Sequence, residues 1–183
     1  MTLTRRRALK RLFGLGAGLT AISAAGGHFL PMPAVRRAEA ASDAGDPAWN
    51  LTPEEWRERL TDMQFAVLRE EATERAFTSP LLEIKAEGTY HCAGCDLALY
   101  PSDTKFDSRT GWPSFWAPVA EDAVGTKTDF KLIYPRTEVH CARCGGHQGH
   151  IFNDGPEPTG KRHCINGVAM VFRPSDGGEP VIG

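Results

Sequence analysis

Four of the five cysteines in the chain form two C-x-x-C pairs, and this arrangement restricts the fold more than any other feature. The pairs stand in the segments H-C-A-G-C-D and H-C-A-R-C-G, and the fifth cysteine, Cys164, lies apart from them. Two such pairs supply the four soft thiolates of a tetrahedral zinc site. We therefore predict one structural zinc ion per chain, with four ligands: Cys92, Cys95, Cys141 and Cys144.

The two pairs lie far apart in the sequence. The 45 residues between Cys95 and Cys141 exceed the gap of about 15–20 residues in a compact zinc ribbon. A whole domain must therefore close to bring the two turns together. A pair of redox-active dithiols is the alternative, but neither pair stands at a strand–helix junction of the thioredoxin kind. His91 and His140 each precede a ligand, and with four thiolates available we expect both to be bystanders.

Charge is unevenly distributed between the N-terminal segment and the rest of the chain. Residues 1–40 carry seven Lys/Arg and one acidic residue, whereas residues 41–183 carry fourteen Lys/Arg against twenty-two Asp/Glu. Phosphate binding requires a basic face. The acidic body therefore argues against a nucleic-acid partner.

The N-terminal segment has the features of an export signal. T-R-R-R-A-L-K, from Thr4, resembles the twin-arginine motif, and a weakly apolar stretch leads to the small-x-small sequence that ends at Ala40. We expect residues 1–40 to be a signal peptide cleaved after Ala40, and residues 41–50 to be a linker. The mature protein would then be periplasmic, without stable membrane insertion. An uncleaved anchor is the alternative, because about 20 apolar residues can span a bilayer, but the stretch is rich in glycine.

Residues 51–183 are predicted to form one mainly β domain with short N-terminal helices. Thr52, Pro53 and Glu55 make a helix start of the capping-box type, and we expect one or two helices before Arg75. After Phe77, short apolar runs alternate with glycine and proline, a pattern typical of antiparallel strands. The predicted strands are residues 89–92, 97–100, 130–134, 138–141 and 164–172.

Cys164 has the surroundings of a reactive thiol. In one continuous strand from Cys164 to Phe172, the side chains of Cys164 and Asn166 share a face, about 7 Å apart. Lys161, Arg162 and His163 precede the cysteine, and positive charge favours a thiolate. A buried cysteine that acts as a small apolar residue is the alternative.

Two further segments carry candidate functional side chains. His147 and His150 lie in the glycine-framed segment 145–152, which we interpret as a loop that supplies an acid and an orienting donor. No third residue is spaced to complete a metal site with them. The aromatic turn G-W-P-S-F-W contains Trp112, and alone this signal indicates core packing more than a pocket.

Together, these segments resemble a known family. The resemblance rests on K-A-E-G-T-Y-H-C-A-G-C-D, T-K-F-D-S-R-T-G-W-P-S-F, C-A-R-C-G-G-H-Q-G-H-I-F-N-D-G-P and T-G-K-R-H-C-I-N, in order over roughly residues 50–180. They are similar to the B-type methionine sulfoxide reductases, which reduce the R epimer of methionine sulfoxide in proteins. The resemblance implies two antiparallel sheets, a zinc held by four cysteines, and repair of oxidised proteins.

Site roles follow from the resemblance by matching position. Cys164 would be the nucleophile, and His147, His150 and Asn166 would surround the sulfoxide, with Trp112 against the substrate methyl group. Attack would leave a sulfenic acid on the cysteine. A non-enzymatic, zinc-stabilised binding module is the alternative, but such a module has no need for a lone thiol in these surroundings.

The chain departs from the family at a position that affects the reaction cycle. Many members have a resolving cysteine where this chain has Thr110, and Gln148 stands where leucine is usual. With four thiols in the zinc site, no cysteine remains to resolve the sulfenic acid. We therefore expect an external thiol, either thioredoxin-like or a small molecule, to complete the cycle.

Overall fold

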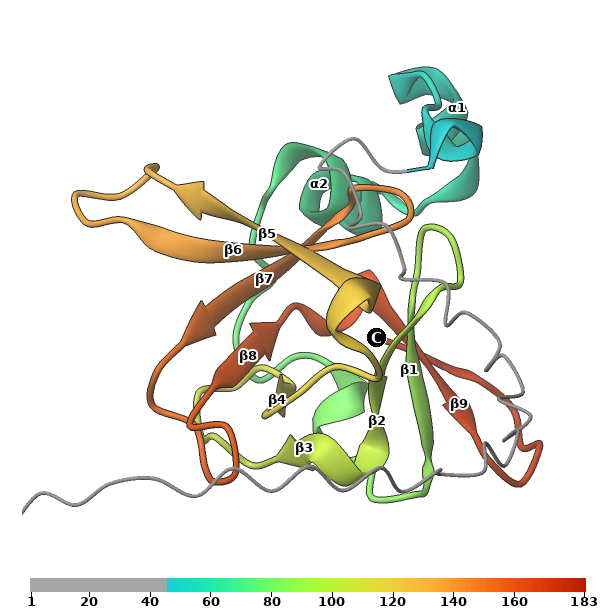
Figure 1. Cartoon of the computed structure of the whole chain (residues 1–183). Coiled ribbons are helices and arrows are strands. Elements are labelled where there is room, and N and C mark those ends of the chain that lie inside the picture. Colours follow the sequence, from blue (N-terminus) through green and yellow to red (C-terminus); the bar gives the residue numbers. More distant parts are fainter. Residues whose placement is uncertain (1–45) are drawn as a thin grey trace, which may run out of the picture. The chain divides into compact units, whose positions relative to one another are not determined.

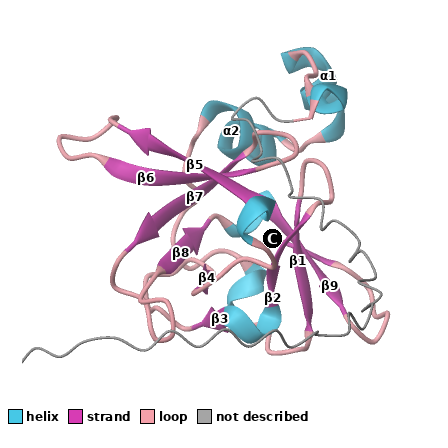
Figure 2. Cartoon of the chain, viewed as in Figure 1, coloured by secondary structure: helices cyan, strands magenta, loops and turns pink. Residues whose placement is uncertain are grey.

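The computed structural model describes residues 46–183, which form two antiparallel sheets with two short helices (Figures 1 and 2). The helices are α1 (Pro53–Arg59) and α2 (Asp62–Glu70). The strands are β1 (Gly88–Cys92), β2 (Ala98–Pro101), β3 (Lys105–Phe106), β4 (Ser114–Phe115), β5 (Val124–Asp129), β6 (Arg136–Cys141), β7 (His147–Phe152), β8 (Arg162–Ile165), β9 (Met170–Pro174) and β10 (Val181–Ile182). The predicted mainly β fold is confirmed.

Local capping determines where the helices begin. At α1 the Thr52 hydroxyl accepts the Glu55 N–H at 3.3 Å, and the Glu55 carboxylate accepts the Thr52 N–H at 2.7 Å. This is the predicted capping box, and Thr61 with Gln64 repeats it at α2. Helix α2 ends before Glu71, whose φ of 56° is left-handed and incompatible with another helical turn.

The two sheets share an aromatic core. Their strand orders are β10-β9-β1-β2 and β3-β4-β8-β7-β6-β5. The ring of Tyr90, on β1, lies 4.9 Å from those of Phe115, on β4, and Phe172, on β9. Tyr100, on β2, stacks on Phe115 at 4.4 Å. All four side chains are fully buried, and truncating one such aromatic typically costs about 3–5 kcal/mol.

The prediction of one strand from Cys164 to Phe172 is wrong. Strand β8 ends at Ile165, a 3-10 turn, η5 (Gly167–Ala169), follows, and β9 then joins the other sheet. The Glu74 carboxylate accepts the N–H groups of Gly167 and Val168 at 2.6 and 3.0 Å. These groups are therefore unavailable to a neighbouring strand, and the chain changes sheets at this turn.

Two other boundaries differ from the predictions. Segment 130–134, predicted as a strand, is the connection between β5 and β6. Its large side chains are exposed, and the carboxylate of Asp129 accepts the Lys131 N–H at 2.8 Å, which ends β5. Conversely, most of segment 145–152, interpreted as a loop, is β7, the strand between β6 and β8.

The predicted signal peptide, residues 1–40, lies outside the described residues, as do residues 41–45 of the predicted linker. The last linker residues include a 3-10 turn, η1 (Pro47–Trp49), and Trp49 stacks on Trp56 of α1 with ring centroids 6.2 Å apart. Within residues 46–183, no helix has the length and apolarity required to cross a membrane.

Candidate active site and metal centre

The four paired cysteines converge into one buried cluster. Their sulfur atoms all lie within 4.8 Å of one another, with Cys92–Cys144 at 3.7 Å and Cys95–Cys141 at 3.5 Å. A tetrahedron of Zn–S bonds near 2.3 Å has edges of about 3.8 Å. The donor set and its spacing therefore suit a tetrahedral metal such as zinc. Cys92 ends β1 and Cys141 ends β6, so each sheet contributes one pair.

Two similar turns hold the cysteines. The N–H of Asp96 donates to the carbonyl of Cys92 at 2.8 Å, and that of Gly145 donates to the carbonyl of Cys141 at 2.9 Å. Asp96 and Gly145 both have left-handed backbones, with φ of 60° and 66°. Neither His91 nor His140 belongs to the ligand cluster.

Gln148 is the polar neighbour of this cluster. It lies on β7, is fully buried, and places its Nε2 amide 3.5 Å from the sulfur of Cys92. An N–H donor to a metal-binding thiolate is a typical outer partner of such sites. The Gln148 amide therefore contacts the cysteine cluster directly, which a leucine side chain could not do as a donor.

A second site is a small cavity of about 130 Å³, and it brings together four of the five predicted catalytic and substrate-binding residues. None of the four clustered cysteines lines it. The lining comprises Thr73, Trp112, Arg136, Gly149, His150, Phe152, Cys164 and Asn166.

Cys164 is half-buried on β8. It is in register with Ser114 of β4 on one side and His150 of β7 on the other. Burial raises the pKa of the thiol above its ordinary value, although Thr110, Arg162 and Ser114 act in the opposite direction. Arg162 therefore favours the thiolate, as expected of a neighbouring cation, but burial outweighs its effect on the pKa.

Of the three basic residues before Cys164, only Arg162 acts on it. Lys161 donates to Asn153 at 2.6 Å. His163 hydrogen-bonds to Tyr100 at 3.1 Å, and burial lowers its pKa to about 4, so it is neutral at pH 7. Arg162 stays charged through a two-pronged contact with Asp154, with both bonds at 2.9 Å.

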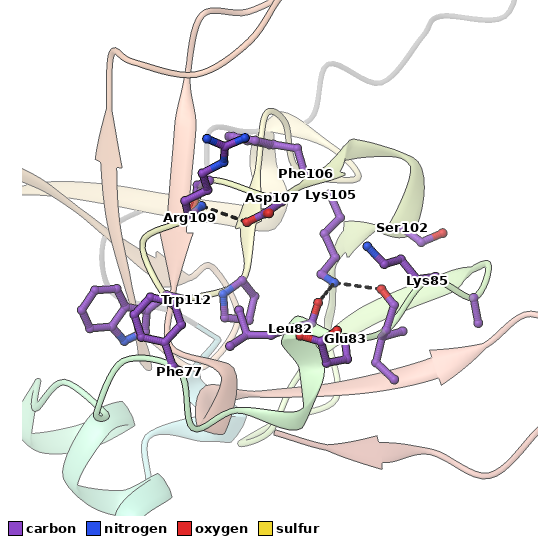
Figure 3. Close-up of a pocket in the computed structure, with 15 residues that line it drawn as sticks. Phe77, Leu82, Glu83, Lys85, Ser102, Lys105, Phe106, Asp107, Arg109 and Trp112 are labelled. Atoms are coloured by element: carbon purple, nitrogen blue, oxygen red, sulfur yellow. Dashed lines mark hydrogen bonds between the residues drawn. The ribbon is translucent and has the colours of Figure 1, made fainter.

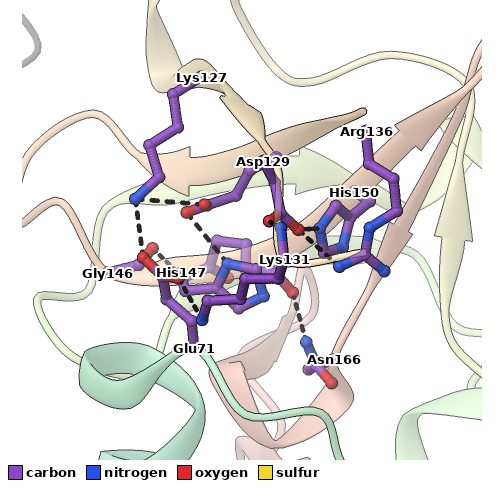
Figure 4. Close-up of polar contacts among 11 residues, drawn as sticks. Glu71, Lys127, Asp129, Lys131, Arg136, Gly146, His147, His150 and Asn166 are labelled. Atoms are coloured by element: carbon purple, nitrogen blue, oxygen red, sulfur yellow. Dashed lines mark hydrogen bonds and ion pairs between the residues drawn. The ribbon is translucent and has the colours of Figure 1, made fainter. Parts of the chain in front are cut away.

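His150 forms a dyad with Asp129, a residue that the sequence analysis missed (Figure 4). The Nε2 atom lies 2.8 Å from the Asp129 carboxylate. Burial lowers the pKa of the imidazole despite this partner. The pKa of Asp129 is held well below its ordinary value, first by the Lys131 backbone N–H and then by His150 and Arg136. With Nε2 engaged, Nδ1 is the nitrogen left to carry a transferable proton.

His147 lies behind His150 rather than in the cavity lining. Its side chain is 3% exposed, and its ring meets that of His150 edge-on at 5.4 Å. Nδ1 lies 3.1 Å from the buried Glu138 carboxylate, an ion-pair distance without hydrogen-bond alignment. Burial opposes ionisation of Glu138, but His147 and Lys127 outweigh it and lower the carboxyl pKa.

Asn166 and Trp112 are held by the same missed residue, Glu74. The Glu74 N–H donates to the Asn166 side-chain oxygen at 3.0 Å, and its carbonyl accepts the Trp112 indole N–H at 3.2 Å. The Asn166 amide also donates to the carbonyl of Gln148 at 3.0 Å. The Glu74 backbone therefore holds two residues of the cavity lining, Asn166 and Trp112, while its carboxylate binds the η5 turn that follows Asn166.

A larger cavity, of about 470 Å³, lies on another side of Trp112 (Figure 3). Lys105 extends into it and donates to the carbonyls of Leu82 and Ile84 at 3.0 and 2.8 Å. Burial lowers the pKa of this amine. The exposed Phe77 ring lies beside Trp112, and the tryptophan lines both cavities.

The missed residues lacked a signal in the sequence because their partners are distant. Glu74 acts on residues more than 90 positions later. Arg136 and Glu138 lie two residues apart on β6, a strand that pairs with β5 on one side and β7 on the other. A strand predicted from residue 136 rather than 138 would have placed both on one face.

Comparison with known proteins matches the SelR domain over residues 60–174. A protein named peptide methionine sulfoxide reductase MsrB from Agrobacterium fabrum is 51% identical over 133 residues, which are 73% of this chain and 98% of that protein. Proteins of the same name from Pseudomonas putida and Leptospira interrogans are 52% and 47% identical. These alignments cover 69% and 68% of this chain and 95% of each relative.

Proposed function

The chain belongs to the MsrB family of peptide methionine sulfoxide reductases, and on this premise we propose that it reduces the R epimer of methionine sulfoxide in oxidised proteins by way of Cys164. It is an oxidoreductase acting on methionine sulfoxide, so the alternative of a non-enzymatic binding module is set aside. The observation that carries the proposal is the cavity in which a half-buried thiol, a histidine, a carboxamide and an indole meet.

The reaction is an oxygen transfer between two sulfur atoms. The thiolate of Cys164 attacks the sulfoxide sulfur and forms an S–S bond while the sulfoxide oxygen is protonated. The resulting hydroxyl then passes to the cysteine sulfur as this S–S bond and the substrate S–O bond break. Methionine leaves as the two-electron-reduced product, and the oxygen remains on the cysteine as a sulfenic acid, which is oxidised by the same two electrons. No further oxidant or reductant enters this half of the cycle.

His150 is the proton donor in this proposal. A proton on Nδ1 passes to the sulfoxide oxygen, and Asp129, which is hydrogen-bonded to Nε2, stabilises the imidazolium form that carries this proton. The buried His147 ring packs edge-on against the ring of His150 and helps to hold it in place. The Asn166 amide orients the substrate, and Trp112 packs against its methyl group.

An external thiol closes the cycle. Thr110 lies 3.8 Å from the sulfur of Cys164, at the position of the resolving cysteine in many family members. A thioredoxin-like protein or a small thiol attacks the sulfenic acid, releases water and forms a mixed disulfide, and a second thiol then frees Cys164.

The metal and the location of the protein complete the proposal. The four clustered cysteines hold one structural zinc ion, which fits their spacing. Residues 1–40 direct export by the twin-arginine route and are removed after Ala40, so the enzyme repairs oxidised proteins in the periplasm. That route carries folded proteins, which suits a zinc site loaded in the reducing cytoplasm.

Activity on separated epimers tests the proposal. The wild type is expected to reduce dabsyl-methionine-R-sulfoxide with a strong dithiol and to leave the S epimer unchanged. Cys164→Ser is expected to lose all turnover while keeping its zinc, because Cys164 is not a ligand. Zinc content and thermal unfolding serve as controls. Wild-type activity in this variant, or equal consumption of both epimers, would overturn the assignment.

A further inference from the structure

Three hydroxyl groups form a chain that ends on the sulfur of Cys164. The Thr110 hydroxyl lies 3.8 Å from this sulfur and 2.8 Å from the hydroxyl of Ser108. Ser108 lies 2.7 Å from the hydroxyl of Ser114, which donates to the carbonyl of Trp112 at 3.2 Å. The chain thus connects the thiol to the backbone of a residue in the cavity wall.

Each hydroxyl has one proton, and this fixes the direction of the chain. With Ser114 donating to the Trp112 carbonyl, Ser108 must donate to Ser114, and Thr110 to Ser108. Thr110 then has only its lone pairs free, so the neutral Cys164 thiol donates to it. Every bond in this arrangement has one donor and one acceptor, as expected for the protonated cysteine.

A thiolate requires the opposite direction, because it can only accept. If all three hydroxyls rotate, Ser114 donates to Ser108, Ser108 to Thr110, and Thr110 to the sulfur. The one bond lost is that from Ser114 to the Trp112 carbonyl, the longest hydroxyl–oxygen contact of the chain. No proton moves along the chain; the thiol proton goes to water at the cavity mouth.

We propose that Thr110, Ser108 and Ser114 form a reversible hydroxyl chain that stabilises the thiolate of Cys164 by turning its donors toward the sulfur. The inference rests on the proposed role of Cys164 as nucleophile. Thr110 is then more than the absence of a resolving cysteine, since its hydroxyl touches the reacting atom and is a catalytic group. Arg162 from the same strand and Ser114 from β4 also act on this sulfur directly, and the hydroxyl chain adds the donors of the segment before β4.

The test is the pH dependence of iodoacetamide alkylation at Cys164 in the full-length, zinc-loaded protein, followed by mass spectrometry. Thr110→Val has a similar shape but lacks the hydroxyl, and we expect its alkylation midpoint to rise by about one pH unit, the size of one hydrogen bond to a charged group. Thr110→Ser keeps the hydroxyl and is expected to titrate like the wild type.

Ser108→Ala provides a second test without changing any atom in contact with the sulfur. It removes the donor behind Thr110, and we expect a smaller upward shift of the same midpoint. Zinc content shows whether each variant is folded. Wild-type alkylation midpoints in both Thr110→Val and Ser108→Ala would contradict the proposed role of the hydroxyl chain. Because alkylation reports the thiol whether or not sulfoxide is reduced, this result is distinct from a failure of the proposed activity.

Discussion

At the scale of single residues, Cys164 and His150 at rest have protonation states opposite to those that the proposed reaction needs. Burial raises the pKa of the Cys164 thiol above its ordinary value and lowers that of the His150 imidazole below its ordinary value. At neutral pH most molecules therefore hold a thiol and a neutral imidazole, whereas attack requires a thiolate and an imidazolium. In this account, only the small fraction of molecules that holds both the thiolate and the imidazolium is active.

This reversal predicts a broad pH profile. As pH rises toward the pKa of His150, thiolate increases and kcat/KM rises; between the two pKa values the gain in thiolate and the loss of imidazolium cancel. We therefore expect a plateau between an acidic limb, set by the lowered pKa of His150, and an alkaline limb, set by the raised pKa of Cys164.

His150→Ala separates the two limbs. The variant is expected to lose about 10²–10⁴-fold in kcat/KM at neutral pH. Its remaining activity should rise with pH until the thiol ionises, with no decline at alkaline pH. A variant that kept the plateau would show that another group delivers the proton.

At the scale of elements, β7 connects the metal centre to the active site. The Gln148 side chain contacts the sulfur of Cys92. Its backbone carbonyl accepts the backbone N–H of Asn166 at 2.8 Å and the side-chain amide of the same residue at 3.0 Å. The cavity-lining His150 lies two residues along the strand, after Gly149, where an added Cβ would collide with the backbone of Cys164. Strand β7 therefore contacts both the cysteine cluster and the active-site cavity.

Gln148→Leu isolates the side-chain half of this connection. The variant loses the amide donor to the Cys92 sulfur, and removal of such an outer partner typically weakens metal binding about 10–100-fold. Competition with a zinc indicator measures this loss. Sulfoxide reduction by the zinc-loaded variant should change little, because the contacts to Asn166 come from the backbone. Unchanged zinc affinity would contradict the role of the amide.

Sequence patterns predicted the parts of the molecule that depend on near neighbours. The Thr52 capping box and the two cysteine turns followed from short segments, whereas the assignment of Trp112 to the site of Cys164 and Asn166 came from the family resemblance. The break after Ile165 could not be predicted, because Glu74 causes it from more than 90 residues away. The β5–β6 connection was missed because its apolar run is exposed and resembles a strand.

At the scale of the whole domain, the cysteine cluster connects the two sheets. One pair follows β1 of the four-stranded sheet, and the other follows β6 of the six-stranded sheet. A bound zinc ion contributes on the order of 10–16 kcal/mol of apparent binding energy in small modules. Using one of these cysteines to resolve a sulfenic acid would release the link between the sheets. On the proposed function, we therefore expect a cycle in which only Cys164 changes its oxidation state.

Mass spectrometry after a single turnover tests this claim most directly. The zinc-loaded enzyme is mixed with methionine-R-sulfoxide without reductant, and its intact mass and free thiols are measured. The account predicts a gain of about 16 Da on Cys164, one oxygen, with the four zinc thiols unmodified. A loss of about 2 Da, from a disulfide between Cys164 and a zinc ligand, would contradict it.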